Sequence, residues 1–94
     1  MILDGKAISG RMELHGALKA GLGLPEHYGR NLDALNDCLS ELEEHPDVQI
    51  VHMDALRDSI GKYADRLIEV FERNGFAITY IDENTESVYN EDSQ

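Results

Sequence analysis

The sequence predicts a small α/β domain: a parallel sheet of three strands packed with about four helices. Three short apolar runs, at 1–3, 48–52 and 76–81, are typical of buried strands. Longer segments between them carry apolar residues at helical spacing, which is typical of β–α–β crossovers and therefore of parallel pairing. A length of 94 residues suits one domain of this kind. The strand order does not follow from this pattern.

The first half of the chain contains one strand and two predicted helices. A turn at Asp4-Gly5 follows the first strand, and a helix is predicted over 11–22. Its apolar face comprises Leu14, Leu18 and Leu22. Glycines and a proline then predict a loop over 23–30. Asn31 is the predicted N-cap of a second helix over 31–44, because its side chain can accept from the free N–H groups of the first turn.

The second half follows the same alternation. After the strand at 48–52, residues 53–59 predict a short helix or turn, and 62–74 predict a longer helix that Asn74-Gly75 terminates. The third strand ends this series. The predicted domain therefore spans residues 1–82, and the acidic segment 83–94, which has no basic residue, is expected to be a flexible tail.

The charge balance limits the classes of partner. Nineteen acidic residues against eight basic ones give a net charge of −11, which argues against binding nucleic acid or anionic membranes and favours a cationic protein. The single cysteine, Cys38, allows no intramolecular disulfide, and no segment has the pattern of a secretory signal or a membrane span. We expect a cytoplasmic protein, monomeric when free, without cofactor or metal.

The predicted helix over 31–44 concentrates acidic residues on one side. On a helical wheel Leu32, Leu35, Leu39 and Leu42 share an arc that Cys38 borders. The opposite side carries Asp33, Asp37, Glu41 and Glu44. Most charged helix faces are simply solvated, but like charges four residues apart repel, and a face selected for stability would alternate Glu with Lys. We interpret this acidic side as a binding surface for a basic partner.

One stretch carries a family resemblance. The segment LPEHYGRNLDALNDCL, residues 24–39, resembles the signature of the barstar family, intracellular inhibitors of the secreted ribonuclease barnase, and the resemblance extends over roughly 1–82. It implies a three-stranded parallel sheet surrounded by helices. It also implies that the acidic helix and the loop before it plug the active site of the ribonuclease, where carboxylates take the place of RNA phosphates. Asp37 would then be the central carboxylate and Asp33 the second.

The sequence departs from the family pattern at three places. His27 stands where the family has a tyrosine, Asn36 replaces a tryptophan, and Arg73 occupies the position of a glutamate, with Glu72 beside it. Glu72 can replace that glutamate through a small helix rotation, or the contact is absent. The predicted partner-binding residues are His27, Tyr28, Gly29, Asn31, Leu32, Asp33, Ala34, Asn36, Asp37, Glu41 and Glu72.

Two alternatives to a barstar-type inhibitor remain open from the sequence. Asn36 and Arg73 are compatible with an interaction or immunity module that neutralises a different basic toxin or nuclease. A metal-dependent hydrolase using the helix carboxylates is the third interpretation. The four histidines lack paired metal-ligand spacing, no nucleophile motif is present, and carboxylates on an open helix lack the burial that separates catalytic pKa values. We therefore expect no enzymatic activity.

Overall fold

The computed structural model describes residues 1–81, and the predicted tail at 83–94 lies outside the described residues. Three parallel strands, β1 (Ile2–Asp4), β2 (Val48–Val51) and β3 (Ile78–Ile81), form one sheet in the order β1-β2-β3. The connections contain a 3₁₀ turn, η1 (Gly5–Ala7), and the helices α1 (Arg11–Leu22), α2 (Leu32–Glu41), α3 (Met53–Ile60) and α4 (Tyr63–Arg73). The predicted α/β fold with a parallel sheet is confirmed.

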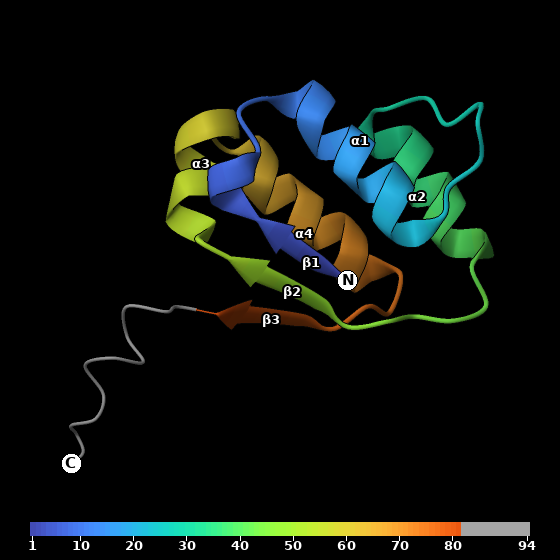
Figure 1. Ribbon diagram of the computed structural model, residues 1–94. Helices are drawn as coiled ribbons and strands as arrows, with labels where there is room; N and C mark the ends of the chain where they lie inside the picture. Colours follow the sequence, from blue (N-terminus) through green and yellow to red (C-terminus); the bar gives the residue numbers. More distant parts are fainter. Residues whose placement is uncertain (82–94) are drawn as a thin grey trace, which may run out of the picture.

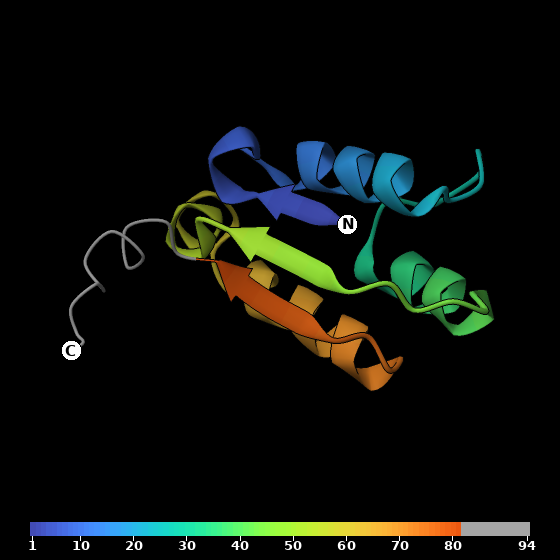
Figure 2. The same ribbon diagram turned by 60° about the horizontal axis from the view of Figure 1, so that its bottom comes forward.

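The helices cover one face of the sheet, as Figures 1 and 2 show from two directions. The strand register explains which face this is. Leu3 and Ile50 are paired across β1 and β2 and are both buried under the helices. Ile2, one position earlier, points to the opposite face and is 65% exposed. The domain therefore has a single apolar core on one side of the sheet.

The core holds the helices against each other as well as against the sheet. Helix α4 contributes Leu67, Val70 and Phe71 to the core and packs against both α2 and α3. Helix α2 contributes Leu35 and Leu39. Among residues 1–81, no helix is long and apolar enough to cross a membrane.

Two predicted boundaries were wrong by more than one residue. Helix α2 ends at Glu41 rather than at residue 44, because Leu42 adopts an extended backbone (φ −76°, ψ 133°) as the chain turns towards β2. Glu44 is therefore not on the helix. Strand β3 begins at Ile78 rather than at residue 76. Phe76 instead leaves the helix end and enters the core, with its ring edge-on to Phe71 at 5.4 Å between centroids.

The turn η1 packs closely against the beginning of α3. A Cβ atom added to the buried Gly5 would collide with the backbone oxygen of His52 and lie 2.8 Å from the Leu56 nitrogen. His52 itself has a left-handed backbone (φ 59°) where β2 turns into α3. Glycine is thus needed at position 5 because two backbone segments meet there without space for a side chain.

Candidate functional site: the acidic surface of helix α2

Helix α2 starts at a well-formed cap. The Asn31 side chain accepts from the Ala34 N–H at 2.7 Å, which satisfies one of the free donors of the first turn, and Asn31 Nδ2 donates to the Gly29 carbonyl at 3.3 Å. The predicted N-cap is confirmed. A Cβ atom on Gly29 would lie 3.1 Å from the Ala34 Cβ, so the loop lies directly against the first turn of the helix. Leu32 and Ala34 are half-buried in this arrangement.

The outer side of α2 carries an unbroken series of carboxylates. Asp33, Asp37 and Glu41 are all exposed and lie on successive turns of the helix. Asp33 is near the positive end of the helix dipole, whereas no basic residue occupies the last turn. Within residues 1–81, ion pairs join Lys19 to Glu26 and Arg57 to Asp65, so no described cation forms a salt bridge with these three carboxylates. The side chains produce a concentrated negative potential.

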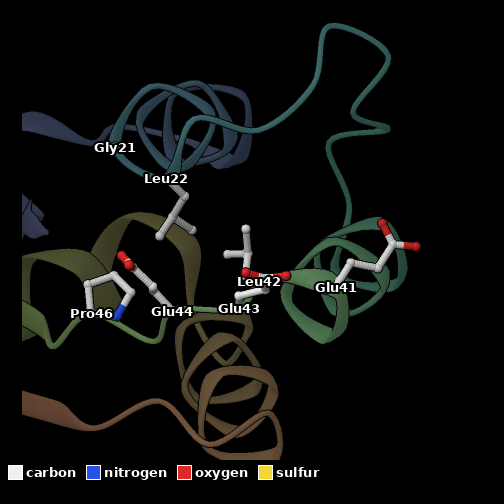
Figure 3. A pocket seen from close by; sticks show the side chains of 7 residues that line it. All are labelled: Gly21, Leu22, Glu41, Leu42, Glu43, Glu44 and Pro46. Atoms are coloured by element: carbon white, nitrogen blue, oxygen red, sulfur yellow. The ribbon is translucent and has the colours of Figure 1, made fainter.

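The negative surface continues past the end of the helix. A groove of about 410 Å³ lies between the end of α1 and the connection from α2 to β2. Figure 3 shows Leu22 and Leu42 within this groove and Glu41 pointing away from them. The lining residues are Gly21, Leu22, Glu41, Leu42, Glu43, Glu44 and Pro46. Glu44, which the sequence placed on the helix, therefore contributes its charge from the connection instead.

A side-chain bond joins the middle of α2 to the end of α4. Asn74 Nδ2 donates to Asn36 Oδ1 at 2.8 Å and to the Val70 carbonyl at 2.9 Å. Asn36 is half-buried, and its amide oxygen bridges the two helices by accepting this bond. Glu72 and Arg73, both exposed, occupy the last turn of α4 just before this bridge. They lie on a different helix from the three carboxylates.

The loop before α2 contains both exposed and buried residues. His27 and Gly29 are exposed, whereas Tyr28 between them is only 5% exposed and its ring belongs to the core. The Tyr28 ring therefore offers little surface to a partner, although the sequence had suggested it as a contact residue. Arg30 follows with a left-handed backbone (φ 58°), a conformation that non-glycine residues rarely adopt. The chain thus bends sharply between Tyr28 and the Asn31 cap.

Tyr28 is held by a buried histidine that the sequence did not single out. His15 is 1% exposed; its Nδ1 lies 2.6 Å from the Tyr28 hydroxyl and its Nε2 lies 2.7 Å from the Tyr63 hydroxyl. Desolvation lowers the pKa of His15, and the charges of Arg30 and Arg11 lower it further. Burial likewise raises the pKa of the Tyr28 hydroxyl. The sequence did contain a signal for this bond. Residue 15 falls on the leucine face of its helix and is therefore expected to be buried, and a buried polar side chain needs hydrogen-bond partners.

The Cys38 thiol lies on α2 near the acidic side chains. Burial raises the pKa of the Cys38 thiol, and the nearby Glu41 and Asp37 charges raise it further, which disfavours the nucleophilic thiolate. No group of three or more potential metal ligands is found in the described part of the chain. The carboxylates of α2 form a charged surface that is exposed to solvent.

Comparison with known proteins finds a matching family model and a similar protein. A family model described as "Barstar (barnase inhibitor)" matches residues 1–88. A Bacillus subtilis (strain 168) protein named "Putative ribonuclease inhibitor YrdF" is 37% identical over 73 residues, which cover 77% of this chain and 80% of that protein. The family match spans nearly the whole chain, and the relative shares this identity over most of both lengths. The chain therefore belongs to the barstar family.

Proposed function

We propose that this chain inhibits a small basic bacterial ribonuclease by occupying its active site with the exposed face of α2 and the loop before it. The observation that carries the proposal is the series Asp33, Asp37 and Glu41, three exposed carboxylates on successive turns that form no salt bridge with a described cation. In the free protein these carboxylates repel one another, and a cationic partner would remove that repulsion on binding.

The partner chemistry follows from the carboxylates. An active site that binds RNA phosphate holds arginine, lysine or histidine side chains, and a carboxylate can accept from the same donors, bidentately in the case of arginine. Asp37, in the middle of the series, would take the central phosphate position and Asp33 the neighbouring one. The flanking contacts would come from His27, Gly29, Asn31, Leu32, Ala34, Asn36, Glu41 and Glu72. The inhibitor itself would perform no catalysis.

Electrostatics would govern how fast the complex forms. With a net charge of −11 on 94 residues, the inhibitor attracts a basic enzyme over distances comparable to the Debye length, about 10 Å at 0.1 M salt. Added salt shortens this range, so the association rate should fall steeply with ionic strength. The glutamates of the α2–β2 connection would add to this attraction without contacting the active site.

An inhibition titration tests the proposal. Barnase and related small basic ribonucleases are mixed with increasing amounts of the chain at low and moderate salt, and RNA cleavage is followed. We expect stoichiometric inhibition of at least one enzyme, weaker at higher salt, and its loss in the double variant Asp33→Asn, Asp37→Asn. Asp58→Asn, an exposed carboxylate on α3, is the control and should inhibit like the parent protein. Undiminished inhibition by the double variant would refute the assigned surface.

One observation favours a second candidate partner. Arg73 is exposed at the end of α4, directly before the Asn74 side chain that bonds to α2. A cation beside the acidic face suits a basic toxin or nuclease that presents an acidic residue at this point. Inhibition of a non-barnase toxin, abolished by Arg73→Glu, would support this alternative, whereas stronger inhibition of barnase by Arg73→Glu would support the first.

A further inference from the structure

The last part of the loop before α2, from Tyr28 to Asn31, is anchored at both of its ends. At one end the Tyr28 hydroxyl lies 2.6 Å from His15 Nδ1 inside the core. At the other end the Asn31 side chain caps α2 through the Ala34 N–H at 2.7 Å. Only Gly29 and Arg30 lie between these two anchors. The exposed residues next to these anchors, His27, Gly29 and Arg30, are therefore positioned by contacts that lie beneath the surface.

The backbone between the anchors needs such support. Arg30 has a φ of 58°, and a left-handed backbone is unfavourable for a side chain with a Cβ atom. Conformations of this kind persist when the surrounding structure overdetermines them. The Asn31 cap acts on the helix side of Arg30. On the other side, the Tyr28–His15 bond is supplemented by a turn in which the Tyr28 N–H donates to the Pro25 carbonyl at 3.0 Å.

The histidine is well suited to hold Tyr28. Its second nitrogen is occupied by the Tyr63 hydroxyl of α4 at 2.7 Å, so both ring nitrogens have partners and the ring orientation is determined. A ring contact adds to this, because the Tyr63 ring meets the imidazole edge-on with 5.9 Å between centroids, and the Arg11 guanidinium carbon lies over the Tyr63 ring, 4.1 Å from its centroid. The imidazole thus connects the loop to α1 and α4, both part of the core.

We propose that His15 is a positioning residue for inhibition: through Tyr28 it holds residues 27–31 in the conformation that the ribonuclease meets, before the enzyme arrives. This inference rests on the proposed function. A loop ordered in advance loses little conformational freedom on binding, which strengthens affinity without adding any contact. In this arrangement the buried Tyr28 hydroxyl holds the loop in place, while the residues on either side of Tyr28 contact the partner.

Two single-atom variants separate positioning from general stability. Tyr28→Phe removes the hydroxyl on the loop side of His15, and Tyr63→Phe removes the one on the α4 side. Both delete one hydrogen bond to the same imidazole, but only the first frees the loop. His15→Gln is the conservative variant, because its amide retains a donor and an acceptor. Urea denaturation first establishes that the variants are folded and how much stability each loses.

The free protein provides the readout that is independent of any partner. The Tyr28 N–H donates to the Pro25 carbonyl at 3.0 Å, so it is a protected amide in the loop. We expect Tyr28→Phe to speed hydrogen exchange of the amide at position 28 about tenfold while Ile50 in β2 keeps its protection, and Tyr63→Phe to change exchange of this loop amide less than threefold. Unchanged loop exchange in Tyr28→Phe would overturn the proposal. If the parent chain inhibits none of the ribonucleases tested, the proposed function fails, and the exchange result still decides whether His15 and Tyr28 hold the loop.

Inhibition provides the second readout. We expect Tyr28→Phe to weaken inhibition of a responsive ribonuclease about tenfold, equivalent to ~1.4 kcal/mol, with partial recovery of function in His15→Gln relative to His15→Ala. Tyr63→Phe should inhibit within threefold of the parent protein. Equal losses of inhibition in the two phenylalanine variants, in proportion to their stability losses, would show that the network only stabilises the fold and would overturn the positioning role.

Discussion

Replacing Asp37 by alanine should move folding stability and partner binding in opposite directions. Asp37 is exposed in the middle of α2, four residues after Asp33 and four before Glu41. Each like-charge pair at this spacing destabilises a helix by roughly 0.2–0.5 kcal/mol, and the substitution removes two. Alanine is also the better helix former, by about 0.6 kcal/mol relative to aspartate. The free energy of unfolding should therefore rise by about 1 kcal/mol.

Binding should respond with the opposite sign. Removing one partner of a desolvated, hydrogen-bonded charge pair at an interface costs about 2–5 kcal/mol, because the other charge is left buried without compensation. Even the lower figure corresponds to a loss of affinity of roughly thirtyfold. A variant that is more stable and yet inhibits poorly cannot be explained by damage to the fold.

The assay combines urea denaturation, followed by far-ultraviolet circular dichroism because the chain has no tryptophan, with inhibition of a responsive ribonuclease. Asp58→Ala on α3 is the matched control: it removes one exposed helical carboxylate and the same net charge, and should leave inhibition unchanged. A loss of stability in Asp37→Ala that accounts for its loss of inhibition would refute the reasoning, as would full inhibition by this variant.

Three further predictions concern the fold. Because the pKa of His15 is lowered in the folded state, the unfolded chain takes up the proton first, so the free energy of unfolding should fall as the pH drops below about 6.5. His15→Gln should reduce this fall, as urea midpoints at pH 8 and pH 5 would reveal; an unchanged dependence would point to other groups. Gly5→Ala should destabilise by about 1–3 kcal/mol, because the added methyl meets the backbone of His52 and Leu56, and a wild-type melting temperature would contradict that packing. Deleting residues 84–94 should leave the melting temperature within a few degrees, because all three strands and the core lie within 1–81; a large drop would show that the removed segment supports the fold.

The features that local sequence patterns determine were the ones predicted well. The Asn31 cap and the helix ended by Asn74-Gly75 depend on residues within one or two turns, and the strands depend on short apolar runs. The wrong end of α2 has a tertiary cause: the leucine spacing continues to Leu42, but the chain must leave the helix there to reach β2. Periodicity alone contains no information about that requirement.

In the candidate site, too, the features set by local sequence were predicted and those set by tertiary contacts were not. The exposed positions of Asp33, Asp37 and Glu41 follow from helical spacing and were predicted correctly, whereas Glu44 lies beyond the end of the helix. The burial of Tyr28 and the bond between Asn36 and Asn74 depend on partners 13 and 38 residues away on other elements, and no local pattern indicates such partners. Loop residues on either side of a buried aromatic look alike in sequence, and only the packing distinguishes the ones that face solvent.

The exposure of the acidic face has a consequence for how this protein changes over generations. Leu35 and Leu39 are buried and support the core, whereas Asp33 and Asp37 on the same helix are exposed and oppose helix stability through their mutual repulsion. If the proposed function holds, selection by the partner retains these aspartates despite their mutual repulsion. In a lineage that lost its ribonuclease, these two positions should drift to neutral or basic residues while the leucines persist. Their retention or loss among relatives would record whether each descendant still has an enzyme to inhibit.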